Sequence, residues 1–172
     1  DMHLAAMHEM SGLKVCFTRA ANVYGPGQPM YRIIPRALLF ARLGRRLRLD
    51  GGGQSTRSFI HIADVADATL RIATSGTPGQ SYHISTNEIV SIKDLVKKVC
   101  QLTHIEYESL VEVGPERAGK DDTYMLNSDR LRRELAWSPS INLDTGLGDT
   151  LAWVDANLAE LATEPDGYVH KE

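Results

Sequence analysis

The feature that most constrains the fold is a helical segment that leads directly into a buried strand. Residues 1–10 (DMHLAAMHEM) carry apolar side chains at helical spacing, and Gly12 suits the left-handed conformation that often ends a helix. The next segment, LKVCFTRA at residues 13–20, is rich in β-branched and aromatic side chains, which is typical of a buried strand. This order predicts an α/β fold with a parallel sheet.

The alternation of strands and helices continues along the chain. We predict further short strands at residues 45–49, 57–62, 81–85 and 110–113. Apolar stripes at spacings of three and four predict helices at residues 34–43, 63–73, 92–100 and 128–137, and a last helix that begins near residue 144. Ser91 with Asp94 forms a capping-box-like pattern before the third of these helices. Residues 21–30 are rich in Gly and Pro and predict a loop.

Composition excludes several classes of protein. The formal charge of −3, from 19 basic and 22 acidic residues, argues against a nucleic-acid partner. No apolar run approaches the roughly 20 residues needed to span a bilayer, so we expect no membrane segment. Cys16 and Cys100 are interpreted as buried small hydrophobic residues rather than a disulfide, which suits a reducing cytoplasm. Because the chain begins inside a helical pattern without a start Met, we expect a fragment of a longer protein.

The segment DGGGQSTRSFIHIADV at residues 50–65 looks at first like a loop that binds phosphate. A Walker loop needs Lys followed by Ser or Thr after its glycines, whereas Gln54 follows Gly53 here. A dinucleotide fingerprint fails as well, because Met30 stands where the third glycine after Gly25 and Gly27 should be. The three glycines therefore predict a turn between two strands.

Two arginines lie in or just after loops that contain glycine: Arg57 after GGGQST, and Arg117 in PERAGKDD. A guanidinium offers a planar fork of donors that matches phosphate oxygens in pairs, so two converging arginines would fit a diphosphate. The alternative is that each arginine is a solvated surface residue or pairs with a local carboxylate such as Glu116 or Asp121. The residues alone leave both interpretations open.

The histidines and tryptophans give weaker signals. His3 and His8 lie five residues apart, which is not the spacing for a shared metal on a helix, so no metal site is expected. His61 and His83 fall in predicted strands, where a hydrogen-bonded structural histidine is the favoured interpretation. Trp137 and Trp153 lie on apolar helical faces, which favours packing in the core.

Several segments in their order carry a resemblance to a known family. They are TRAANVYGPGQ, IIPRAL, GGGQSTRSFIHIADVADA, YHIS, ERAGKDDTYMLNSDRLRRELAWSP and GLGDTLAWV. The chain resembles the C-terminal part of the NAD-dependent epimerase/dehydratase family, the extended short-chain dehydrogenases that act on nucleotide sugars. Within this family it looks most like the dTDP-glucose 4,6-dehydratases, chiefly through ERAGKDDTYMLN.

The resemblance implies a division of the chain and a set of binding residues. Residues 1–25 and 58–85 would complete a Rossmann domain that binds NAD, while 26–57 and 86–172 would form a small α/β domain for the nucleotide sugar. The resemblance implies that Asn22, Arg57 and Arg117 contact the diphosphate of the substrate. Asn87 would lie near the nucleotide, and Ala20 with Ala21 would border the nicotinamide. A cytoplasmic homodimer is implied for the full-length parent.

The sequence lacks two motifs that members of the family carry. The glycine fingerprint and the Tyr-x-x-x-Lys catalytic pair of the family are absent, so no catalytic residue is expected here and the isolated fragment is expected to be inactive. Two positions depart from the dTDP-glucose dehydratases: Asp50 stands where an aromatic residue often packs on the base, and Lys120 where some have histidine. Three other interpretations stay open: a 4-epimerase, a decarboxylase, and a non-catalytic binding module of the same fold.

Overall fold

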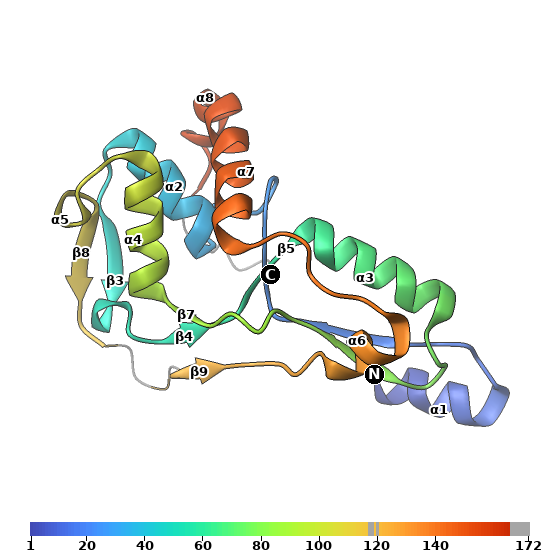
Figure 1. Cartoon of the computed structure of the whole chain (residues 1–172). Coiled ribbons are helices and arrows are strands. Elements are labelled where there is room, and N and C mark those ends of the chain that lie inside the picture. The colour runs from blue at the N-terminus through green and yellow to red at the C-terminus, as the bar shows by residue number, and fades with distance from the viewer. Residues whose placement is uncertain (117–118, 120, 166–172) are drawn as a thin grey trace.

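The computed structural model describes residues 1–116, 119 and 121–165, and its strands are short and mainly parallel (Figure 1). Three parallel pairs form: β1 (Phe17–Ala20) with β6 (Ser81–Ile84), β2 (Asn22–Tyr24) with β5 (Phe59–His61), and β3 (Leu47–Asp50) with β8 (Val111–Gly114). A further strand, β4 (Thr56–Arg57), lies between antiparallel β7 (Val90–Ser91) and parallel β9 (Thr123–Tyr124). The predicted α/β fold with parallel strands is confirmed.

Helices account for most of the remaining described residues. They are α1 (Met2–Ser11), α2 (Ile33–Leu43), the 3₁₀ turn η1 (Gly51–Gly53), α3 (Ile62–Ser75), α4 (Ile92–Thr103), α5 (Tyr107–Leu110), α6 (Asp129–Leu135), α7 (Leu143–Ala156) and α8 (Leu158–Leu161). The predicted ends are confirmed, because Gly12 and Gly44 both adopt the left-handed conformation just after α1 and α2. The predicted cap of α4 is confirmed too, since the Ser91 hydroxyl accepts the Asp94 N–H at 2.9 Å.

Two clusters of buried apolar side chains hold these elements together. The first cluster joins α2, α4 and α7 to β3 and β8, and includes Leu38, Leu47, Leu95, Val99, Leu147 and Val154. The second joins α3 and α6 to β5 and β6, and consists of Ala21, Ile60, Ala68, Ile72, Tyr82, Ile84, Leu131 and Trp137. Leu131 and Trp137 pack in the second cluster although they fall within the range 86–172 that we assigned to the substrate domain. The boundaries of that division remain a prediction.

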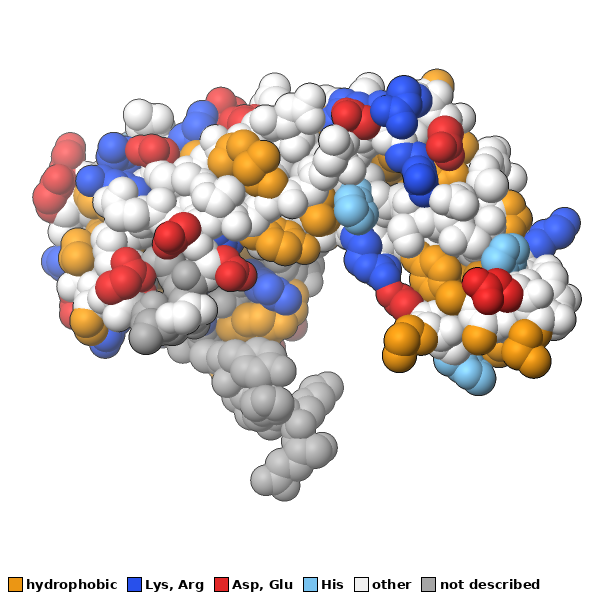
Figure 2. Space-filling view, turned by 90° about the horizontal axis from the view of Figure 1, so that it is seen from below, with side chains coloured by type: hydrophobic (Ala, Val, Ile, Leu, Met, Phe, Trp, Pro, Cys, Tyr) orange, Lys and Arg blue, Asp and Glu red, His pale blue; other side chains and the backbone are white. Residues whose placement is uncertain are grey.

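The N-terminal segment departs from expectation in its burial. Only residues 17–20 of the predicted strand 13–20 form β1, and within β1 only Phe17 is buried, so the expectation of a buried strand is wrong for most of it. The reason is that β1 pairs along one edge, with β6, and that α1 has no buried residue. Figure 2 shows hydrophobic side chains on the surface at the α1 end of the molecule, where Met2 and Met10 are 89% and 87% exposed.

Among the described residues, no helix is both long enough and apolar enough to cross a bilayer.

An ion pair between α2 and α7 gives a first testable expectation. Arg42 donates to both carboxylate oxygens of Asp155, at 2.6 and 2.9 Å, and this hydrogen bonding lowers the pKa of Asp155. A carboxyl whose pKa is lowered by folding stabilises the protein above its unfolded pKa of about 3.9, and the contribution is lost as the pH falls through the folded value. Because both side chains are partly exposed, we expect Asp155→Asn to cost no more than about 1 kcal/mol at pH 7.

The measurement is urea unfolding of the full-length protein and of Asp155→Asn at pH 7 and in acid. The difference should shrink as the pH falls below the folded pKa of Asp155. Asp149→Asn, a change on the same helix, serves as the control. A deficit in Asp155→Asn that is equally large at both pH values would show that the ion pair is not its cause.

Candidate functional site

A pocket of about 620 Å³ opens where β2 ends and the chain turns toward α2. Its wall is formed by residues 21–29 and 31–34, together with Phe59 at the start of β5 and Ile62 at the start of α3. The segment 21–30 was predicted to be loop throughout, but Asn22–Tyr24 form a strand because they pair in register with Phe59–His61. The pocket thus lies at the carboxyl end of paired parallel strands, where open α/β sheets commonly bind ligands.

Asn22 lies in this wall at the start of β2. Its backbone N–H and its side-chain amide both donate to the Ser58 carbonyl oxygen, each at 3.1 Å. Because Ser58 directly follows Arg57, these bonds bring Asn22 close to the segment that carries the arginine. The amide oxygen and the second amide hydrogen of Asn22 are not used in these bonds.

Arg57 is half-buried and is held by backbone carbonyl groups. Its guanidinium donates to the carbonyl oxygens of Thr56 at 2.7 Å, Asp121 at 2.8 Å and Asp122 at 3.3 Å. The alternative of a surface arginine paired with the carboxylate of Asp121 is not what the structure shows, because the contact is to the Asp121 main chain. Carbonyl oxygens orient the guanidinium without neutralising its charge, so Arg57 remains a suitable partner for an anion.

Arg117 itself lies outside the described residues. Two of the three carbonyl groups that bind Arg57 belong to Asp121 and Asp122, which follow Arg117 closely in the sequence. The Thr56 backbone N–H also donates to the Asp122 carbonyl at 2.8 Å. Asp121 and Asp122 are therefore anchored to β4.

The ends of the paired strands β1 and β6 lead into three further predicted site residues: Ala20, Ala21 and Asn87. Asn87 is exposed in the bend after β6, next to Thr86, whose hydroxyl lies 2.9 Å from the Ser58 hydroxyl. Ala21 follows β1, donates its N–H to the Ile84 carbonyl at 2.9 Å and lines the pocket. Ala20 precedes it and is half-buried. Ala20, Ala21 and Asn22 are consecutive in the chain, and Asn87 lies three residues beyond the end of β6, the strand that pairs with β1.

A network of buried hydroxyl groups beneath this site was not predicted. Ser58 and Ser85 are 1% and 0% exposed, and their hydroxyl oxygens lie 3.1 Å apart. Ser128 and Arg132 both donate to the Ser85 carbonyl oxygen, at 3.1 and 3.2 Å. The network ties the turn after β6 to α6 and to the residue that follows Arg57. Sequence offered no signal for it, because isolated serines are common in loops.

Tyr24 is the deepest aromatic residue of the pocket wall. Burial, followed by the nearby carboxylates of Glu88 and Asp64, raises the pKa of its hydroxyl above the ordinary value, so the group stays protonated near neutral pH. The Tyr24 ring lies edge-on to the His61 ring, at 5.4 Å between centroids. His61 is buried, and its Nδ1 accepts the Ala63 N–H at 3.4 Å, which agrees with the predicted structural role.

Arg32 is a cation of the pocket that sequence reasoning missed. It is exposed, it precedes the first residue of α2, and its guanidinium lies 5.1 Å from the centre of the Tyr31 ring. The available signal was its position between a Gly- and Pro-rich loop and a helix start. In the part of the chain that the structure describes, no cluster of three His, Cys, Asp or Glu residues could hold a metal ion.

The three glycines form the predicted turn between β3 and β4. All three have positive φ values, between 58° and 73°. The carboxylate of Glu116 occupies the space that a side chain at Gly51 would need, whereas Gly52 has no neighbour closer than 3.9 Å to that position. The turn therefore accommodates the Glu116 carboxylate beside Gly51.

This difference between neighbouring glycines can be tested by substitution. We expect Gly52→Ala to lower the free energy of unfolding by about 1 kcal/mol, the cost of a left-handed alanine. Gly51→Ala should cost only slightly more, because the Glu116 carboxylate that it displaces is the end of an exposed side chain. Chemical denaturation of both variants measures the difference, and a much larger loss in Gly51→Ala would show that the Glu116 side chain cannot give way.

The family to which the chain belongs follows from a comparison with known proteins. A family model described as GDP-mannose 4,6 dehydratase matches residues 1–150. The chain therefore belongs to this family of nucleotide-sugar dehydratases, and the resemblance noted in the sequence is confirmed.

Individual relatives agree with this assignment. The dTDP-D-glucose 4,6-dehydratase of Mus musculus is 34% identical over 161 residues, which cover 88% of this chain and 45% of that protein. The solved dTDP-glucose 4,6-dehydratase of Streptomyces venezuelae, with NAD and a second ligand bound, has a TM-score of 0.87 at 28% identity and covers 92% of this chain and 49% of that one. The UDP-glucose 4-epimerase of Thermotoga maritima, solved with UDP-glucose, has a TM-score of 0.85 at 25% identity and covers 91% and 51%. The chain spans about half the length of these relatives.

Proposed function

We propose that the full-length protein is an NAD-dependent nucleotide-sugar 4,6-dehydratase and that these residues bind its substrate. Asn22, Arg57 and Arg117 would contact the diphosphate, and Asn87 would lie near the nucleotide. The dehydration proceeds by oxidation of the sugar at C4, loss of water across C5 and C6, and return of the hydride to C6. In this proposal the described residues hold the sugar in place and supply no acid or base.

The observation that carries the proposal is the link between Asn22, which lines the pocket, and the Arg57–Ser58 segment. Two hydrogen bonds from Asn22 to the Ser58 carbonyl fix this arrangement, and three carbonyl groups orient the Arg57 guanidinium. A diphosphate needs donors that are oriented and a positive charge that is not already neutralised. Asn22 lines the pocket of about 620 Å³, which is large enough for part of a nucleotide sugar, whereas Arg57 is not a lining residue and precedes the lining residue Phe59 by two positions.

The end of β1 fits the nicotinamide that the proposal requires. Ala21 lines the pocket wall, and Ala20 and Ala21 carry only methyl side chains, so a flat ring could lie against them without a clash. NAD would accept and return a hydride within each turnover. The family's glycine fingerprint is absent from these residues, so we propose that most of the cofactor contacts come from the rest of the full-length protein.

Further parts of the proposal follow from the resemblance. Residues 1–25 and 58–85 would belong to the NAD-binding domain, and residues 26–57 and 86–172 to the nucleotide-sugar domain. The full-length protein would act in the cytoplasm as a homodimer. The two clusters of buried side chains support a chain built of two parts. The isolated 172 residues should neither turn over a nucleotide sugar nor bind NAD tightly.

An epimerase is the second candidate, because the solved UDP-glucose 4-epimerase of Thermotoga maritima shares this fold. A decarboxylase and a binding module without catalysis are the third and fourth candidates. The residues around a catalytic tyrosine would decide among them, and no tyrosine of this sequence has a lysine four residues later. Incubation of the full-length protein with nucleotide sugars, followed by identification of the product, separates the four possibilities.

A further inference from the structure

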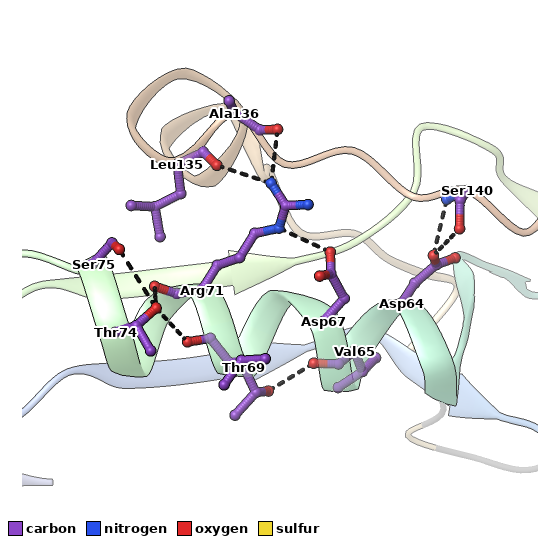
Figure 3. Close-up of polar contacts among 11 residues, drawn as sticks. Asp64, Val65, Asp67, Thr69, Arg71, Thr74, Ser75, Leu135, Ala136 and Ser140 are labelled. Atoms are coloured by element: carbon purple, nitrogen blue, oxygen red, sulfur yellow. Dashed lines mark hydrogen bonds and ion pairs between the residues drawn. The ribbon is translucent and has the colours of Figure 1, made fainter.

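Asp64 is a buried carboxylate that the proposed chemistry does not use. It lies in the first turn of α3 and is 4% exposed. One carboxylate oxygen accepts the Ser140 N–H at 2.9 Å and the Ser140 hydroxyl at 2.8 Å, and the other accepts the Ile141 N–H at 3.1 Å. Figure 3 shows the contact between α3 and Ser140. Such a carboxylate is costly to bury unless its partners are held in place, so these bonds fix residues 140–141 firmly.

The segment that Asp64 holds is the connection between α6 and α7. Trp137, at its start, is buried in the second cluster, whereas Leu143, the first residue of α7, is buried in the first cluster. Arg71, also on α3, donates to the Leu135 and Ala136 carbonyls at 3.4 and 3.3 Å (Figure 3). The connection therefore crosses from one cluster to the other while it is attached to α3 at two points.

The N-terminal half of α7 in turn supports the pocket wall. The Tyr24 hydroxyl donates to the Leu143 carbonyl oxygen through a long hydrogen bond of 3.5 Å. Tyr24 also packs against Gly146 so closely that its hydroxyl occupies the place of a side chain there. Tyr24 lines the pocket, but Asp64 does not. A shift at residues 140–141 would thus reach the pocket through the start of α7 and through Tyr24.

We propose that Asp64 is a positioning residue: it holds the start of α7 so that Tyr24 and the wall of the pocket stay in the arrangement that binds the ligand. Asp64 touches no ligand in this account. The identity of the ligand as a nucleotide sugar rests on the proposed function, whereas the role of Asp64 in holding the pocket wall does not.

The test is Asp64→Asn in the full-length protein, with Glu112→Gln as the control. Glu112 is an exposed acidic residue on β8, away from the connection between α6 and α7. Hydrogen exchange should become about tenfold faster at the amides of residues 22–25, 27 and 28 in Asp64→Asn, with α4 unaffected and Glu112→Gln unchanged. Ser140→Ala removes one of the three bonds and should shift exchange in the same direction, which keeps the test decisive if Asp64→Asn does not fold.

Calorimetry with dTDP-glucose and with NAD supplies the second readout. Asp64→Asn should weaken sugar-nucleotide binding about tenfold and change NAD affinity much less, because most of the cofactor contacts are proposed to come from the rest of the full-length protein. Partial unfolding alone would instead lower the active fraction equally for both ligands. Unchanged exchange at residues 22–28, or faster exchange spread evenly over both clusters, would overturn the role of Asp64. If the wild-type protein binds no nucleotide sugar, the proposed function fails, and the exchange experiment still decides about Asp64.

Discussion

Replacement of Arg57 by Ala in the full-length protein should weaken the binding of a nucleotide sugar by roughly 10- to 100-fold. A forked guanidinium bound to phosphate contributes about 1.5–3 kcal/mol, and a tenfold change in affinity corresponds to about 1.4 kcal/mol. The structure supports this expectation because Arg57 is oriented by carbonyl groups while its charge stays available. Calorimetric titration with the nucleoside diphosphate isolates the interaction from the sugar.

Two further variants make this experiment specific. Arg57→Lys keeps the charge but loses the fork, so its affinity should fall between those of the wild type and Arg57→Ala. Arg48→Ala removes an exposed arginine whose partner in the described structure is Asp50, at 3.5 Å, and serves as the control for net charge. If Arg57→Ala binds the nucleoside diphosphate as tightly as the wild type, Arg57 has no role at the diphosphate.

Gly146→Ala is expected to lower the free energy of unfolding by about 2 kcal/mol. A methyl group at this position would meet the hydroxyl and the ring of Tyr24, both of which are buried against α7. Overpacking of this kind costs roughly 1–3 kcal/mol, because either the ring or the helix must move. Urea unfolding of the full-length protein measures the loss.

The chain provides a matched control two residues further along the same helix. Gly148 has no atom within 4 Å of the position of an added methyl group, so Gly148→Ala should stabilise the protein by about 0.5–1 kcal/mol through helix propensity. Tyr24→Phe removes the hydroxyl that Gly146 accommodates and should reduce the cost of Gly146→Ala in the double variant. Equal effects of the two glycine substitutions would contradict the packing described here.

Local features of the fold were predictable from sequence because each depends on neighbouring residues. The left-handed glycines after α1 and α2 and the Ser91 cap of α4 follow rules of helix termini. β2 was missed for the opposite reason. Its three residues become a strand only by pairing with β5, more than thirty residues later, and the adjacent Gly and Pro residues indicate a loop.

The site shows the same limit. The resemblance to a known family indicated Asn22 and Arg57 as site residues. The bonds from Asn22 to the Ser58 carbonyl, however, depend on the register between two strands. Asp64 was even less predictable. An acidic residue in the first turn of a helix is already explained by the helix dipole, and its actual partners lie 76 and 77 residues away. Contacts over such distances follow from the packing of the two clusters rather than from any local pattern.

The central claim is that the full-length protein dehydrates a nucleotide sugar held partly by these residues. The most direct measurement is incubation with NAD and, separately, dTDP-glucose, UDP-glucose, GDP-mannose and a UDP-sugar acid, with each product identified by mass spectrometry and NMR. The account predicts loss of one water molecule from one of the neutral sugars, a 4-keto-6-deoxy product and no net consumption of NAD. A product of unchanged mass, loss of carbon dioxide from the sugar acid, or no turnover of any substrate would contradict it.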